Sequence, residues 1–140
     1  MAQVSAAIGQ AEVVATPLHM ASVAAAVASG AWHQPTLIAG ASATATVLAL
    51  DPGVAQKLRT LMGLVVSDPK GTGTAAAVPG TPVAGKTGTA EYGRANPPAT
   101  HAWFIGYRGG VAFAVLVEGG GVGGKVAAPL AAKFLSQLPG

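Results

Sequence analysis

One segment limits the possible folds of this chain more than any other. Val111–Val117 reads Val-Ala-Phe-Ala-Val-Leu-Val and holds no polar side chain. Because side chains alternate between the two faces of a strand, Phe113 and Val115 would point to one face and Ala114 and Leu116 to the other. A strand that is apolar on both faces has to be covered on both. We therefore expect it to lie in a sheet with helices on its two sides.

Two further strands are expected beside this one. Residues 101–107 read His-Ala-Trp-Phe-Ile-Gly-Tyr, and Arg108-Gly109-Gly110 separates them from Val111–Val117, which is a hairpin signal. Residues 83–90 also suit a strand, with glycines where a ligand or another backbone comes close. The sequence therefore predicts an α+β fold with an antiparallel sheet, to which this chain contributes these three strands.

The helices that would cover the sheet have clear start signals. Thr16-Pro17 and Asp51-Pro52 each place an N-cap residue before a proline at the first helical position. Gly30 is a suitable stop for the first of these helices. Apolar side chains recur at helical spacing after Pro52. The predicted helices span residues 17–29, 52–66 and 126–138.

The remaining segments are predicted as connections. Residues 8–15 suit a loop or short strand, and residues 32–46 suit a loop with extended pieces at 36–38 and 46–48. Further loops are expected at 67–80 and 92–100, and the glycine-rich residues 119–124 are expected to form a flexible connector.

Composition narrows the function classes. A chain of 140 residues suits one domain, and its eight basic residues are scattered rather than gathered. Aromatic residues make up only 5% of the chain, so it lacks the basic stripe with stacking rings that is typical of nucleic-acid binding, and no nucleic acid is expected as a partner. The absence of cysteine excludes disulfides and thiolate chemistry. The longest apolar run, residues 21–28, is shorter than the roughly 20 residues that cross a bilayer.

Polar chemistry concentrates around Lys86. Gly85 precedes this lysine, and Thr87, Gly88 and Thr89 follow it. Only 9% of the residues are charged, whereas a solvated surface usually carries several charges together. A single lysine between glycines in such a chain is more typical of a functional site than of an ordinary turn.

Two motifs fit these residues, and they imply different enzymes. Residues 80–87, from Gly80 to Thr87, satisfy the pattern GxxxxGK[ST], whose backbone N–H groups cradle phosphates and whose threonine hydroxyl meets Mg²⁺. A P-loop needs a buried strand before its first glycine and a helix opening at the lysine, and Pro79 and the β-branched threonines suit neither. The apolar residues 114–117 before Glu118 keep nucleotide binding open as an alternative. Lys86-Thr87-Gly88-Thr89 equally satisfies the KTG element of β-lactamases and penicillin-binding proteins.

Three ordered segments carry a family resemblance. They are Ile8-Gly9-Gln10 with Thr16-Pro17-Leu18-His19-Met20-Ala21, then Ala84-Gly85-Lys86-Thr87-Gly88-Thr89-Ala90-Glu91, and then residues 101–107. In these segments the chain resembles the C-terminal part of a class B penicillin-binding protein transpeptidase domain, with Ala11 where glycine is usual. The resemblance extends over nearly all of residues 1–140. It implies a fragment of an α/β/α sandwich, without the N-terminal portion that carries the SxxK and SxN motifs.

The resemblance also implies a function. Members of the family are extracytoplasmic serine acyltransferases, associated with the cell membrane, that cross-link peptidoglycan and are acylated by β-lactams. Lys86 would supply positive charge and a hydrogen bond to a proton relay, while Thr87, Gly88 and Thr89 would bind the substrate carboxylate. The backbone N–H of Thr89 would be an oxyanion-hole donor. The expected ligands are peptidoglycan stem peptides and β-lactams, without a metal or cofactor.

The chain departs from the family in lacking two motifs. No SxN is present, because Asn96 is the only asparagine and Arg94 stands two residues before it. Ser67-Asp68-Pro69-Lys70 spells SxxK, but at a predicted helix end, whereas a nucleophile needs the N-terminus of a buried helix. We interpret this match as a coincidence, so no nucleophile is expected in this chain and it should be inactive alone. A non-catalytic assembly module on the same scaffold is a further alternative.

The final expectation concerns partners. Val111–Val117 carries no charge, proline or bulge that would protect a sheet edge from pairing with another chain. The resemblance implies that one edge of this strand pairs with residues 101–107 and that the other edge pairs with a strand from the N-terminal portion. We therefore expect another chain, either that N-terminal half or a second copy, to pair at Val111–Val117.

Overall fold

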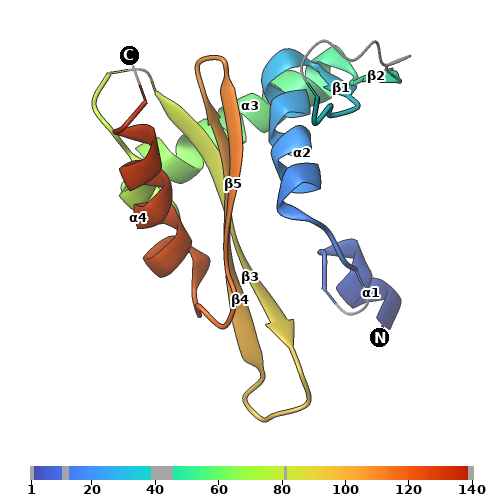
Figure 1. The fold of residues 1–140 in the computed structure, drawn as a ribbon, viewed down its shortest axis with the longest axis vertical. Helices are drawn as coiled ribbons and strands as arrows, with labels where there is room; N and C mark the ends of the chain where they lie inside the picture. The colour runs from blue at the N-terminus through green and yellow to red at the C-terminus, as the bar shows by residue number, and fades with distance from the viewer. Residues whose placement is uncertain (1, 11–12, 39–45, 81, 139–140) are drawn as a thin grey trace.

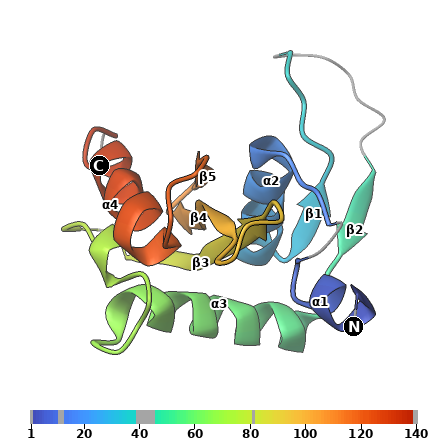
Figure 2. The ribbon, with the colours of Figure 1, turned by 90° about the horizontal axis from the view of Figure 1, so that it is seen from below.

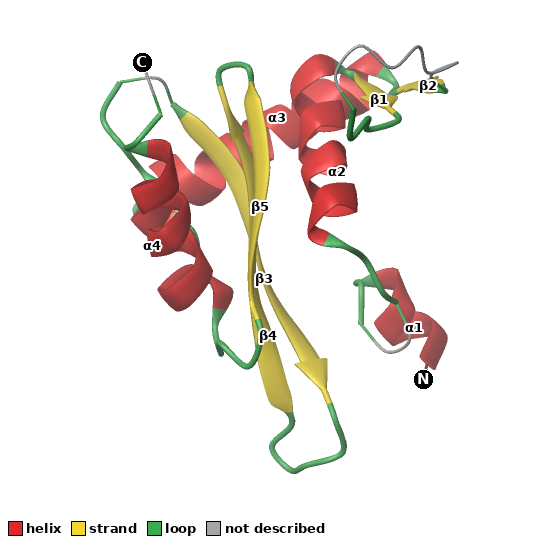
Figure 3. Ribbon diagram, viewed as in Figure 1, coloured by secondary structure: helices red, strands yellow, loops and turns green. Residues whose placement is uncertain are grey.

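The computed structural model describes residues 2–10, 13–38, 46–80 and 82–138. Its elements are α1 (Ala2–Ala7), α2 (Pro17–Ser29), β1 (Ala31–His33), β2 (Val47–Ala49), α3 (Pro52–Ser67), the 3-10 turn η1 (Thr74–Ala76), β3 (Val83–Tyr92), β4 (Ala99–Arg108), β5 (Val111–Val117) and α4 (Gly123–Leu135). The long β3–β4 hairpin runs through the middle of the molecule, with α4 and α2 on its two sides (Figure 1). Figure 3 shows the same arrangement by secondary structure.

The central sheet is antiparallel, with strand order β3-β4-β5. Its register places Lys86 opposite Ile105 on β4, and Ile105 opposite Ala114 on β5. In the part of the chain that the structure describes, β5 pairs with β4 alone and therefore forms one edge of the sheet. The predicted α+β fold with an antiparallel sheet is confirmed.

One face of the sheet packs against α4. Phe104 and Phe113 are buried on this face, and Ala127, Ala128 and Ala131 of α4 pack against them. Alanines at the contact allow the helix axis to come close to the two rings. This cluster is the main hydrophobic core.

The Phe104 ring explains why residue 85 is a glycine. A Cβ atom at Gly85 would lie 2.3 Å from Cζ of Phe104, which is far inside van der Waals contact. The strand that carries Lys86 is therefore held against the core through a residue without a side chain.

The opposite face of the sheet packs against α2 and α3. Val27, Met62 and Ala84 form a second buried cluster, with Leu58 and Tyr107 partly buried beside it. The view from below shows the sheet between α4 and α2, with α3 running under β3 (Figure 2). The expectation that helices cover both faces of the sheet is confirmed.

The predicted capping residues of α2 and α3 are confirmed. Thr16 Oγ1 accepts a hydrogen bond from the backbone N–H of His19 at 3.2 Å, and Asp51 Oδ1 accepts one from that of Val54 at 2.9 Å. Gly30 ends α2 with φ of 88°, a left-handed conformation that favours glycine.

Several predicted boundaries were wrong. Residues 36–38 form no strand; instead Ala31–His33 pairs with Val47–Ala49, one residue beyond the second predicted piece. The Trp32 indole donates to Ser22 Oγ at 2.9 Å, which ties this small sheet to α2. The loop predicted at 92–100 is shorter, because β3 extends to Tyr92 and β4 begins at Ala99.

The ends of the chain also differ from expectation. Helix α1 was not predicted, and residues 8–10 and 13–15, within the predicted loop or short strand, contain no strand. Helix α4 spans Gly123–Leu135 rather than residues 126–138. Gly123 is buried, so this end of the expected flexible connector is packed, and contact with the sheet overrides the low helix propensity of glycine.

Candidate active-site strand

The residues Lys86 to Thr89 lie in the middle of β3, inside a continuous ladder with β4. Side chains alternate along a strand, so Thr87 and Thr89 share one face and Lys86 lies on the other. Thr87 and Thr89 are on the face that α4 covers, opposite Phe104 and Ala102 in the register. The two threonine hydroxyls therefore lie on one face of β3 and the lysine amine starts from the other, although the three residues lie within four consecutive positions.

The Lys86 amine reaches the free edge of β3. Its side chain is exposed, and Nζ donates a hydrogen bond to the Thr87 carbonyl oxygen at 2.5 Å. In a strand the N–H and C=O of one residue point to the same side, and every second residue points away from the partner strand. The Thr89 carbonyl accepts from Gln10 and so points away from β4, and the Thr87 carbonyl, two residues before it, points the same way, so the amine lies at the edge that β4 does not occupy.

Thr89 is held by the N-terminus of α4. The backbone N–H of Gly123 donates to Thr89 Oγ1 at 3.3 Å. A Cβ atom at Gly123 would lie 2.2 Å from the Gly88 carbonyl oxygen, so only glycine permits this approach. Because the Thr89 hydroxyl accepts from Gly123, its own proton can be donated to another acceptor.

Thr87 has a hydroxyl partner that the sequence analysis did not identify. Thr72 Oγ1 lies 2.8 Å from Thr87 Oγ1. Thr72 belongs to the segment predicted only as a loop, and no motif singled it out. The pair again leaves one hydroxyl proton available for a third acceptor.

Gln10 is the second residue that sequence reasoning did not assign to the site. Its amide nitrogen donates to the Thr89 carbonyl oxygen at 3.0 Å, and its amide oxygen accepts from the Glu91 N–H at 3.2 Å. The Thr89 carbonyl therefore points to the free edge of β3, and the Thr89 N–H points the same way. The family resemblance did include the segment Ile8-Gly9-Gln10, which could have indicated this residue, but it gave the glutamine no role.

The other residues considered in the sequence lie apart from this cluster. Ser67 is the exposed last residue of α3, and Asp68 follows it as the C-cap. Asn96 lies in the β3–β4 connection, before a cis peptide bond to Pro97. Gly80 precedes the strand, and Lys86 lies within it, so no helix opens at the lysine as a P-loop requires.

The described residues contain neither a metal-binding cluster nor a membrane-spanning helix. No group of three or more His, Asp or Glu residues among them is placed to hold a metal ion. None of the described helices has both the length and the hydropathy to cross a bilayer.

A family model matches nearly all of the chain. It is described as the penicillin binding protein transpeptidase domain, and the match covers residues 1–136. The peptidoglycan D,D-transpeptidase PbpA of Mycobacterium tuberculosis is 39% identical over 147 residues, covering 88% of this chain and 29% of the relative. The chain thus spans less than a third of the length of this relative.

Solved structures agree with the sequence matches. The D,D-transpeptidase domain of a peptidoglycan glycosyltransferase from Eggerthella lenta is 33% identical with a TM-score of 0.64, covering 89% of this chain and 33% of that one. The transpeptidase domain of penicillin-binding protein 3 from Burkholderia pseudomallei is 30% identical with a TM-score of 0.66, covering 83% and 39%. Together with the match over residues 1–136, these likenesses show that the chain belongs to the penicillin-binding protein transpeptidase family.

Proposed function

We propose that this chain is part of an extracytoplasmic peptidoglycan D,D-transpeptidase, in which β3 forms one wall of the acyl-transfer site. The observation that supports this most is the environment of Thr89. Its backbone N–H faces the free edge of β3, while Gly123 leaves its hydroxyl proton available beside it. A backbone donor and a hydroxyl donor are thus presented by one residue.

The hydroxyl protons suit a substrate carboxylate. Thr87 and Thr89 lie on the same face, and each has a neighbour that can satisfy its acceptor capacity, so both can donate to carboxylate oxygens. Lys86 adds a positive charge at the adjacent edge of the strand. Gly88 between the threonines presents no side chain that would hinder a peptide terminus from approaching the backbone.

The Thr89 N–H suits the developing oxyanion. Attack of a serine oxygen on the substrate carbonyl places negative charge on that oxygen before the C–N bond breaks and the amine leaves with the serine proton. An oriented backbone N–H stabilises this charge without reorganisation. The serine and its proton relay would come from residues beyond this chain, so we assign no nucleophile here.

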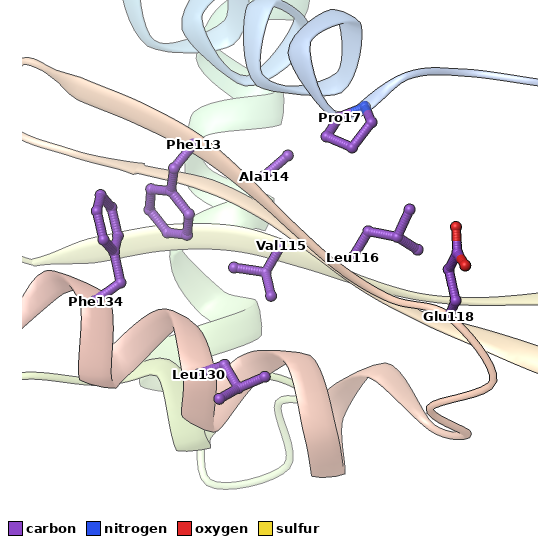
Figure 4. Close-up of a pocket in the computed structure, with 8 residues that line it drawn as sticks. All are labelled: Pro17, Phe113, Ala114, Val115, Leu116, Glu118, Leu130 and Phe134. Atoms are coloured by element: carbon purple, nitrogen blue, oxygen red, sulfur yellow. The ribbon is translucent and has the colours of Figure 1, made fainter.

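A missing partner also fits the open edge of β5. A groove of about 640 Å³ lies along this strand, lined by Pro17, Phe113, Ala114, Val115, Leu116, Glu118, Leu130 and Phe134. Figure 4 shows α2 on one side of β5 and α4 on the other, with apolar side chains directed into the space between them. An edge strand has a neighbouring strand on one side only, so half of its backbone N–H and C=O groups have no hydrogen-bond partner within the sheet.

The shape of this groove favours a single extended strand as its occupant. The helices that flank β5 leave room for a strand, whereas a second copy would bring its own α2 and α4 against them. The mycobacterial PbpA is more than three times as long as the part of it that the chain matches. We assign the groove to an apolar strand from the remainder of the transpeptidase domain.

Labelling with a fluorescent penicillin tests the assigned roles. The chain alone should form no covalent adduct on a denaturing gel, and co-expression with the remainder of the domain should restore labelling. An adduct of the chain alone that disappears in Ser67→Ala would make Ser67 a nucleophile and contradict the proposal.

Two further outcomes separate the alternatives. Tight binding of Mg-ATP by calorimetry, abolished by Lys86→Ala, would support the nucleotide-binding alternative instead. A labelled complex that is unaffected by Lys86→Ala and by loss of the Thr89 hydroxyl would reduce β3 to a structural role, as expected of an assembly module.

A further inference from the structure

The Gln10 side chain occupies the backbone edge that the proposed site would present to a peptide. One amide group makes two hydrogen bonds to β3, donating to the Thr89 carbonyl at 3.0 Å and accepting from the Glu91 N–H at 3.2 Å. These two backbone groups are two residues apart on the same edge of the strand. Gln10 itself is separated from them by about 80 residues of sequence, namely 79 and 81.

This pattern imitates a neighbouring strand. In a parallel pair, one residue donates its N–H to a carbonyl of the partner strand and accepts from the N–H two residues further along. The amide of Gln10 reproduces that pair of bonds. An extended peptide that adds to this edge needs the same backbone groups.

The contact is also easy to release. Both of its hydrogen bonds are exposed to solvent, and Val4 and Ile8 of the same N-terminal segment are 75% and 77% exposed. The strand beneath is held independently by ten residue pairs with β4. Withdrawal of Gln10 would therefore uncover the edge of β3 without displacing the strand.

We propose that Gln10 competes with peptide for the edge of β3 and so determines how readily the site accepts its substrate. The inference rests on the proposed function. Thr89 is the shared residue, since its carbonyl is held by Gln10 while its N–H is the proposed oxyanion donor on the same edge. A peptide that pairs with Thr89 has to replace the Gln10 amide as the donor to that carbonyl.

Binding of a small peptide tests the competition. N-acetyl-D-alanyl-D-alanine is titrated into the 140-residue chain and followed by broadening of its methyl signals in NMR. Gln10→Ala removes both hydrogen bonds, and Gln10→Met removes both while keeping the length of the side chain and adding no charge. Both variants should bind the peptide about fivefold more tightly at pH 7, the scale expected from loss of one or two exposed hydrogen bonds.

Gln137→Ala is the matched control, because Gln137 is exposed and follows α4, whose last residue Leu135 accepts from Arg108 at the end of the sheet remote from Thr89. It should bind as the unaltered chain does. Equal or weaker binding in both Gln10 variants, with binding that still depends on Lys86, would overturn the competition while leaving the proposed function in place. Peptide binding that no variant of Lys86, Thr87 or Thr89 affects would overturn the proposed function and the competition together. The methionine variant keeps the test decisive if the alanine variant does not fold.

Discussion

At the scale of single residues, the proposed site depends on the hydrogen-bond partner of each threonine hydroxyl. Thr89 Oγ1 accepts from the α4 backbone and Thr87 Oγ1 lies beside Thr72 Oγ1. The sequence predicted the threonines and Lys86 through their motif, and the strand that carries them. It did not predict Thr72 or Gln10, because these contacts join segments far apart in the chain and follow no periodic pattern.

Removing the Thr89 hydroxyl should weaken peptide binding while keeping the fold. Thr89→Val keeps the shape and the β-branch but cannot donate to a carboxylate, so we expect about tenfold weaker binding of N-acetyl-D-alanyl-D-alanine. Thr89→Ser retains the hydroxyl and should restore most of the affinity. Equal affinities for all three residues in the NMR titration would show that the Thr89 hydroxyl does not contact the peptide.

Two helical glycines should respond to alanine in opposite ways. At Gly123 a Cβ would lie 2.2 Å from the Gly88 carbonyl oxygen, so Gly123→Ala should lower the free energy of unfolding by about 2 kcal/mol. At Gly63 in α3 a Cβ meets nothing within 4 Å, so Gly63→Ala should raise it by about 0.5–1 kcal/mol. Urea unfolding measures both. A neutral Gly123→Ala would mean that α4 is not seated on β3.

Tyr107 should make the fold sensitive to alkali. Burial raises the pKa of its hydroxyl above the ordinary value of 10.0, while nearby Arg59 acts in the opposite direction. With a raised folded-state pKa, this contribution to stability is complete below pH 10 and is lost as the pH rises through the folded pKa. Tyr107→Phe should therefore lose less stability than the unaltered chain between pH 8 and pH 11 in urea unfolding. An equal loss of stability in Tyr107→Phe and in the unaltered chain would show that Tyr107 does not cause the sensitivity to alkali.

At the scale of elements, strands and capped helices were predictable from local patterns. The caps Thr16 and Asp51 define α2 and α3, and the alternation in Val111–Val117 defines β5. The start of α4 was missed because Gly123 is helical only through its contact with the sheet. The β1–β2 pair was misplaced because the hydrogen bond of Trp32 to Ser22 decides its position.

A charge on the open edge of β5 should weaken strand docking. Ala114 lines the groove from the α2 side of β5, and a lysine there would bring an ammonium group into an apolar space. We expect Ala114→Lys to reduce the yield of the complex with the remainder of the domain in a co-purification experiment. Ala49→Lys places the same charge on the exposed strand β2 and should have no effect.

At the scale of the whole molecule, both faces of the sheet are covered, but among the described residues β5 has no partner strand at its outer edge. Leu130 and Phe134 in the groove are 44% and 42% exposed. Apolar surface beside an unpaired strand edge promotes association. We therefore expect the isolated chain to sediment as concentration-dependent oligomers at micromolar concentration, and as a single complex once the remainder of the domain is supplied. A stable monomer in isolation would contradict this, and a defined dimer would identify a second copy as the occupant.

If β3 binds β-lactams as proposed, the seating of Gly123 on Gly88 has a consequence for drug resistance. An α-helix transmits a tilt along its whole length, and α4 carries the groove residues Leu130 and Phe134 at one end and the donor to Thr89 at the other. Substitutions that change the packing of those two side chains would shift the Gly123 N–H relative to the threonine. Selection for reduced β-lactam sensitivity would then have targets about two to three helical turns away from the antibiotic, at positions that never touch it.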